Sequence, residues 1–215
     1  MKPIQTSLVH RVLFPESCTE RLHPALVLLH GRGADEDDLV GLARYLDERL
    51  LVLSTRAPFP FEFGGFTWYD AEEDGTPGAG RFRESYDRLS LFLDDVLREY
   101  PVDASRLFLL GFSMGAAMAL SLALTRPALF RGVSANSGYL PEKTHLTYRW
   151  NEQPSVKILL SHGTEDPVIP VAAARRTKML LDRGGVQVSY HEYPMGHEIS
   201  EQAIGDVREW MSALL

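Results

Sequence analysis

The chain has 215 residues, of which 45% are hydrophobic and 24% are charged, and these proportions exclude an intrinsically disordered protein. Its 22 basic and 29 acidic residues give a net charge of −7, which argues against nucleic acid as a partner because such binding needs clustered lysine and arginine. The single cysteine, Cys18, excludes an internal disulfide and a cysteine-based zinc site.

The length of the chain predicts one domain over residues 1–215. No apolar run approaches the roughly 20 residues needed to cross a bilayer, and the first residues lack the apolar core of a signal peptide. We therefore expect no integral membrane association and a cytoplasmic location. A homodimer is compatible with this composition.

Short apolar runs that end at turns predict the strands of a sheet. In chain order, the predicted strands cover residues 7–13, 25–30, 50–53, 107–110, 130–135, 156–160 and 186–191. The first and last alternate between apolar and polar residues, as outer strands do. The others are nearly unbroken, which is typical of parallel strands that are buried on both faces.

Amphipathic segments of helical period lie between these runs. The predicted helices cover residues 39–46, 86–100, 116–125, 173–181 and 199–214. Alternating strands and helices predict an α/β fold, with a mostly parallel central sheet and helices on both faces. Residues 59–83 and 139–154 fit neither pattern and are interpreted as long loops. In such a fold, ligands bind at the carboxyl ends of the strands.

The strongest motif is Gly-Phe-Ser-Met-Gly at residues 111–115, which follows a predicted strand and opens a predicted helix. A glycine–serine–glycine turn in this position holds the serine in a strained backbone conformation, with its hydroxyl projecting from the turn. We therefore expect Ser113 to be a nucleophile. The backbone N–H of Met114, at the positive end of the helix, is expected to stabilise an oxyanion.

A serine hydroxyl is a weak nucleophile and needs a base, which in turn needs an acid to orient it. For this kind of turn the acid and then the histidine follow the serine in the chain. Asp166 follows the strand at 156–160 and is preferred over its neighbour Glu165, because the proline-rich turn after it would hold it rigidly. His197 precedes the last helix, whereas His191 lies inside a predicted strand, so His197 is the expected base.

A second oxyanion donor is expected in the turn at residues 31–33, directly after the first buried strand, with the N–H of Arg32 as the donor. His30 and His162 each end an apolar run, and we interpret them as structural histidines that bond to loop backbone. No pair of histidines has the spacing of metal ligands, so we expect no metal.

At these residues the sequence resembles the α/β-hydrolase superfamily and, within it, the family of small carboxylesterases, lysophospholipases and acyl-protein thioesterases. The matching segments are residues 28–34, 68–70, 111–117, 162–170 and 195–197. The resemblance implies a triad of Ser113, His197 and Asp166, an oxyanion hole from Arg32 and Met114, hydrolysis of short or medium acyl esters, and no cofactor. Family members often carry glutamine where this chain has Met114.

The 19 residues between Asn136 and Val156 are too few for a large lid domain, so we expect an open site with residues 59–83 as its main wall. Within that wall Phe66, Trp68 and Tyr69 are interpreted as substrate contacts or as core side chains, and neither reading is preferred. Two weaker candidates for substrate contact are Leu29 and Val168.

The predicted function is a serine hydrolase that cleaves short- to medium-chain carboxylic esters, with a small-molecule ester as its partner. The same triad would serve an acyl thioesterase or a lysophospholipase. A further alternative is a ligand-binding protein on a hydrolase fold that catalyses nothing, since a fold does not determine a function.

Overall fold

A computed structural model describes residue 4 and residues 6–15, 21–72, 76–150 and 156–215 of the chain. Cys18 lies outside the described residues. No helix within the described ranges is long and apolar enough to cross a membrane.

The centre of the molecule is a seven-stranded sheet with the strand order β1-β3-β2-β6-β7-β8-β9. The strands are β1 (His10–Leu13), β2 (His23–Leu29), β3 (Leu51–Thr55), β6 (Val102–Phe112), β7 (Gly132–Asn136), β8 (Lys157–Gly163) and β9 (Val188–Tyr193). Strand β1 is antiparallel to β3, and all other neighbours are parallel. The predicted strands are therefore present, and the mostly parallel sheet is confirmed.

The central strands are buried on both faces because their apolar side chains alternate between two cores. In β2, Ala25, Val27 and Leu29 belong to the larger core, whereas Leu26 and Leu28 belong to the smaller core on the other face. These side chains are completely buried. Burying one such aliphatic side chain contributes about 1.5–3 kcal/mol to folding, so both faces of the strand stabilise the sheet.

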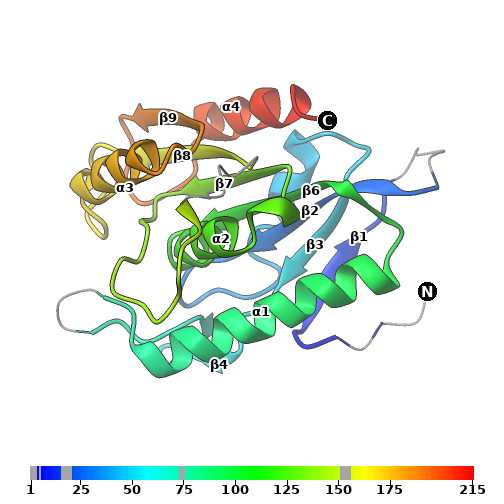
Figure 1. Cartoon of the computed structure of the whole chain (residues 1–215), viewed down its shortest axis with the longest axis horizontal. Coiled ribbons are helices and arrows are strands. Elements are labelled where there is room, and N and C mark those ends of the chain that lie inside the picture. The colour runs from blue at the N-terminus through cyan, green and yellow to red at the C-terminus, as the bar shows by residue number, and fades with distance from the viewer. Residues whose placement is uncertain (1–3, 5, 16–20, 73–75, 151–155) are drawn as a thin grey trace.

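Helices cover both faces of the sheet, as the sequence predicts (Figure 1). The helices α1 (Ala79–Glu99), α2 (Met114–Thr125) and α3 (Val171–Arg183) contribute to the larger core. The 3-10 helix η1 (Val40–Tyr45) and α4 (Glu201–Ser212) contribute to the smaller one. Every residue of α2 is buried, which explains why its sequence is apolar on all sides. A short 3-10 turn, η2 (Pro127–Leu129), follows α2.

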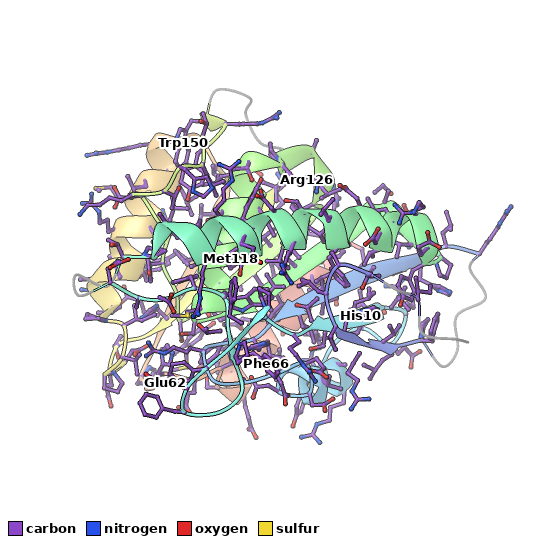
Figure 2. All side chains as sticks on the ribbon, turned by 90° about the horizontal axis from the view of Figure 1, so that it is seen from below. His10, Glu62, Phe66, Met118, Arg126 and Trp150 are labelled. Carbon is purple, nitrogen blue, oxygen red and sulfur yellow. The ribbon has the colours of Figure 1, made fainter. Side chains whose placement is uncertain are left out.

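Two segments differ from the predictions. The segment expected to be a helix at 39–46 is the 3-10 helix η1, and the segment 59–83 is not one long loop. It contains a hairpin of β4 (Phe59–Pro60) and β5 (Phe66–Thr67), and its end is the start of α1. In Figure 2, Glu62 lies in the turn of this hairpin and Phe66 on its returning strand. Residues 139–149 contain neither helix nor strand, in keeping with the absence of a large lid.

Candidate active site

Ser113 occupies the turn between β6 and α2, with a φ of 55° and a ψ of −118°. A side chain in this region of backbone space is strained, and such strain persists only where the surrounding structure holds it. The backbone N–H of Ser113 donates to the carbonyl of Asn136 at 2.9 Å. A Cβ at Gly115 would contact the carbonyl oxygens of Leu29 and His30, so glycine is what allows α2 to begin directly against the end of β2.

Three predicted residues from three separate segments meet at this turn. The Nε2 atom of His197 lies 2.9 Å from Oγ of Ser113, and Nδ1 of the same ring lies 2.7 Å from Oδ2 of Asp166. The other carboxylate oxygen, Oδ1, accepts the backbone N–H groups of Val168 at 2.8 Å and Ile169 at 2.9 Å. The ring can therefore hold a proton on Nδ1 and accept the serine proton on Nε2.

The electrostatics of Asp166 favour the ionised form. Burial on its own would raise the pKa of this carboxyl group. The hydrogen bond from His197 and the two backbone amides outweigh burial, so the pKa lies below its usual value. Asp166 therefore carries a negative charge at neutral pH and can stabilise a protonated imidazole at His197.

The alternatives considered for the acid and the base lie elsewhere. Glu165 is exposed and only its backbone N–H bonds inward, to the carbonyl of Met195 at 3.2 Å. His191 lies on β9, where its ring stacks on Tyr193 and its Nδ1 is 3.8 Å from Asp206. Neither residue is part of the hydrogen-bonded chain that begins at Ser113.

His30 bonds to loop backbone, as expected for a structural histidine. Its Nε2 accepts the N–H of Ala57 at 3.0 Å, which leaves the proton on Nδ1, and Nδ1 donates to the carbonyl of Gly31 at 2.5 Å. Burial lowers the pKa of His30 below its usual value of 6.5, so the ring is neutral. The ring therefore fixes the turn that contains Arg32.

His162 also bonds to backbone, since its Nε2 lies 2.7 Å from the carbonyl oxygen of Ile169. The same nitrogen lies 3.3 Å from Oδ2 of Asp166, and both side chains are completely buried. This second contact with the acid is not predicted by the sequence. The spacing of four residues across the turn was the only signal for it.

The turn at residues 31–33 lies against the nucleophile, as the oxyanion prediction requires. A Cβ at Gly31 would lie 3.4 Å from the Cβ of Ser113, so the two turns are in contact. Among the described residues, the backbone N–H groups of Arg32 and Met114 donate to no backbone carbonyl. Both amides are therefore available to a substrate oxygen. The turn is anchored by the N–H of Gly33, which donates to Phe66 at 2.8 Å.

The predicted substrate contacts divide between core and surface. Leu29 and Trp68 are completely buried, and Tyr69 is 1% exposed, so these three side chains belong to the larger core. Trp68 has a structural role, because its Nε1 donates to the carbonyl of His30 at 2.8 Å. Phe66 is half-buried against the core, while Val168 is exposed.

Two cavities are lined by residues of the site, one by His197 and the other by Val168. The first, here called the His197 cavity, has a volume of about 470 Å³. Its apolar wall consists of Leu39, Leu42, Tyr45, Phe112 and Ile199, and Asp38, Gly41, Arg44, His197 and Glu198 complete it. The second, here called the Val168 cavity, has a volume of about 370 Å³ and is lined by residues that include Tyr139, Leu140, Val168, Ile169 and Ala173.

No group of three or more His, Cys, Asp or Glu side chains that could hold a metal ion occurs within the part of the chain that the structure describes.

Residues 13–215 match the model of the phospholipase/carboxylesterase family. The chain belongs to this family. Acyl-protein thioesterase 1 of Candida albicans is 27% identical over 212 residues, which cover 89% of this chain and 92% of that protein. Carboxylesterase SOBER1 of Arabidopsis thaliana is 26% identical over 156 residues, which cover 69% of this chain and 68% of that protein.

Solved structures agree with this assignment to the family. The Bacillus cereus carboxylesterase is 25% identical and superposes with a TM-score of 0.83, covering 97% of this chain and 95% of that chain. The Mesorhizobium loti carboxylesterase, at 23% identity and a TM-score of 0.85, shows the same fold over 96% of this chain and 95% of that chain. The α/β-hydrolase fold is confirmed, and the protein is a carboxylic-ester hydrolase of the family.

Proposed function

We propose that the protein is a serine esterase that cleaves short- to medium-chain carboxylic esters through an acyl-enzyme. The observation that carries the proposal is the continuous hydrogen-bonded chain from Ser113 through His197 to Asp166, with distances of 2.9 and 2.7 Å. The order and geometry are those that activate a serine hydroxyl.

In the first half of the reaction, Ser113 Oγ attacks the carbonyl carbon of the ester while Nε2 of His197 removes its proton. The negative charge that develops on the carbonyl oxygen is stabilised by the backbone N–H groups of Arg32 and Met114, each of which is worth about 3 kcal/mol in such sites. His197 then donates the proton to the leaving oxygen, and the alcohol departs. Asp166 holds the ring and stabilises its positive charge throughout.

In the second half, water takes the place of the alcohol. His197 accepts a proton from the water as it attacks the acyl carbon, and the same amides stabilise the second oxyanion. The proton then passes from Nε2 to Oγ of Ser113, which releases the carboxylic acid. The exposed position of Val168, and the lack of helix and strand over the described residues 139–149, support an open site for small esters.

Two alternatives remain testable. An acyl thioesterase or a lysophospholipase would use the same triad, and the similarity to acyl-protein thioesterase 1 of Candida albicans favours the thioester as the second substrate class. A non-catalytic ligand-binding protein would have no need for a serine at a strained φ of 55°. The homodimer and the cytoplasmic location stay predictions.

The proposal is tested by treating the folded protein with a fluorophosphonate, followed by mass spectrometry of the intact chain and of its peptides. We expect a single adduct on Ser113, and no adduct in Ser113→Ala. Hydrolysis of an aryl butyrate should disappear in the same variant, and comparing that ester with its thioester measures the preference between the two. Tight ester binding without turnover or adduct would favour the non-catalytic protein.

A further inference from the structure

The His197 cavity is a feature that the proposed reaction has not yet used. His197, Glu198 and Ile199 form one side of it, and the 3-10 helix η1 forms the other. Its volume of about 470 Å³ lies in the range of small-molecule binding sites, and five of its side chains are apolar or aromatic. The cavity is therefore large enough for an organic group, and His197 is part of its lining.

Its position relative to the reacting atoms decides which part of an ester it can take. The leaving oxygen must come within about 3 Å of Nε2 of His197 in order to accept the proton. The carbonyl oxygen must instead lie at the amides of Arg32 and Met114, and neither residue lines the cavity. An alcohol that leaves next to His197 would thus extend into the space beside that ring.

We propose that the His197 cavity is a leaving-group subsite that takes an apolar alcohol or thiol without negative charge. This rests on the proposed function, because it assigns a subsite to the same catalytic serine. The size and apolarity of the group follow from the walls formed by Leu42, Tyr45, Phe112 and Ile199.

The charges at the edge of the cavity determine the second part of the proposal. Asp38 and Glu198 place two carboxylates there, and Arg44 places one guanidinium there. The guanidinium of Arg44 lies 4.7 Å from the centre of the Tyr45 ring and donates to its hydroxyl at 2.7 Å. The two carboxylates therefore disfavour an anionic leaving group.

A cavity-filling variant with a matched control tests the subsite. Gly41 lines the cavity and a Cβ at this position would meet no atom within 4 Å, so the side chain of Gly41→Phe would start in open space. A Cβ at Gly205 is equally free, but Gly205 lies in α4 and does not line the cavity. Leu42→Ala removes part of the wall and tests the opposite change.

The substrates are methyl butyrate and hexyl butyrate, which share the acyl group, followed in a pH-stat. We expect Gly41→Phe to lower the ratio of kcat/KM for hexyl over methyl ester at least about tenfold, since each methylene in an apolar pocket contributes substantially. Leu42→Ala should change that ratio about threefold or more, and Gly205→Phe should not change it.

The acyl-enzyme provides a sharper distinction, because the alcohol has already left at that stage. The acyl chain is still bound at that stage, so a leaving-group subsite should not change how the rate constant for deacylation depends on the acyl chain. We expect Gly41→Phe to leave the ratio of the deacylation rate constants of acetyl- and octanoyl-enzyme unchanged in a single turnover. The proposal is overturned if this variant alters discrimination between acetyl and octanoyl esters of one alcohol while the alcohol ratio stays constant.

Charge preference is measured with butyrate esters whose alcohols carry a neutral, a carboxylate or a trimethylammonium end. Asp38→Asn should raise kcat/KM for the anionic ester relative to the neutral one about three- to tenfold at low salt. Asp37→Asn is the control, because Asp37 is exposed, pairs with Arg11 at 2.7 Å and lies outside the cavity lining. An equal effect of the two substitutions would contradict a local role for Asp38.

Failure of this subsite is distinguishable from failure of the proposed function. A wild-type protein that forms the Ser113 adduct and hydrolyses both esters, but shows unchanged ratios in Gly41→Phe and Leu42→Ala, refutes the subsite alone. A wild-type protein without adduct and without turnover refutes the esterase itself.

Discussion

Replacing Asp166 by asparagine would test the orientation of His197 with almost no change in volume. The asparagine oxygen can take the place of Oδ1, which accepts two backbone N–H groups at 2.8 and 2.9 Å. Its NH2 group would then face Nδ1 of His197, where the carboxylate oxygen now lies at 2.7 Å. A donor in that position forces Nδ1 to be the acceptor and leaves the proton on Nε2.

With a proton on Nε2, the ring can no longer take one from Ser113. Reversing the tautomer in a serine triad costs about 10⁴-fold in kcat, which corresponds to about 5 kcal/mol of barrier at 1.36 kcal/mol per factor of ten. We expect this loss for Asp166→Asn with an aryl butyrate as substrate. The rate of labelling by a fluorophosphonate should fall in parallel, and the ¹⁵N shifts of the ring should report the exchanged tautomer.

The neighbouring carboxylate provides the control for this experiment. Glu165 is exposed and lies outside the hydrogen-bonded chain, so Glu165→Gln should retain nearly full activity. An Asp166→Asn variant that keeps more than about a tenth of the wild-type kcat, with the fold intact by circular dichroism, would refute the assigned role of Asp166.

Three further predictions concern stability. Ser113→Gly and Ser113→Ala should both be inactive. The glycine variant should be about 1 kcal/mol more stable than the alanine variant, because it relieves the strain of a positive φ of 55°. Equal urea midpoints for the two variants would contradict that strain. Gly115→Ala should lower the free energy of unfolding by about 3 kcal/mol or more, since its Cβ would contact the Leu29 carbonyl oxygen. Gly205→Ala is the control, because its Cβ has open space, and it should be neutral or stabilising in the same urea titration. Burial lowers the pKa of His30 below its usual 6.5, so as pH falls below 6.5 the unfolded chain takes up a proton at this ring before the folded chain does. The contribution of neutral His30 to stability is therefore complete above pH 6.5 and decreases by up to about 1.4 kcal/mol per pH unit below it. Urea unfolding at pH 7.5 and 5.5 should show this decrease, and His30→Gln should show less of it.

Much of this site could be predicted because a parallel sheet brings the carboxyl ends of its strands to one edge. Ser113 after β6, Asp166 after β8 and His197 after β9 each follow a strand that the apolar runs identify. The proline-rich turn after Asp166 then selected it over Glu165, and the position of His197 before the last helix selected it over His191, which lies inside a predicted strand. The distances that join them required the structure.

Other features could not be read from local patterns. Leu39, Leu42, Ala43 and Leu46 have the three- and four-residue spacing of an α-helix, whereas the segment closes with bonds three residues apart, from the N–H of Leu42 to Leu39 and from the N–H of Leu46 to Ala43, which the apolar pattern does not record. The strands of the β4–β5 hairpin have two residues each, too few for an alternation to be recognised. The complete burial of Trp68 depends on tertiary packing, and nothing in its neighbours along the chain indicates it.

The backbone contact at Gly115 also bears on how this protein could change over time. Because α2 begins directly against β2, the nucleophile and the oxyanion turn are held by main chain and not by variable side chains. The walls of the His197 cavity come largely from η1 and from the loop of residues 197–199 before α4. Mutation at Leu42 or Tyr45 could therefore alter substrate range while the reacting groups keep their geometry, which makes η1 the natural segment to randomise in directed evolution.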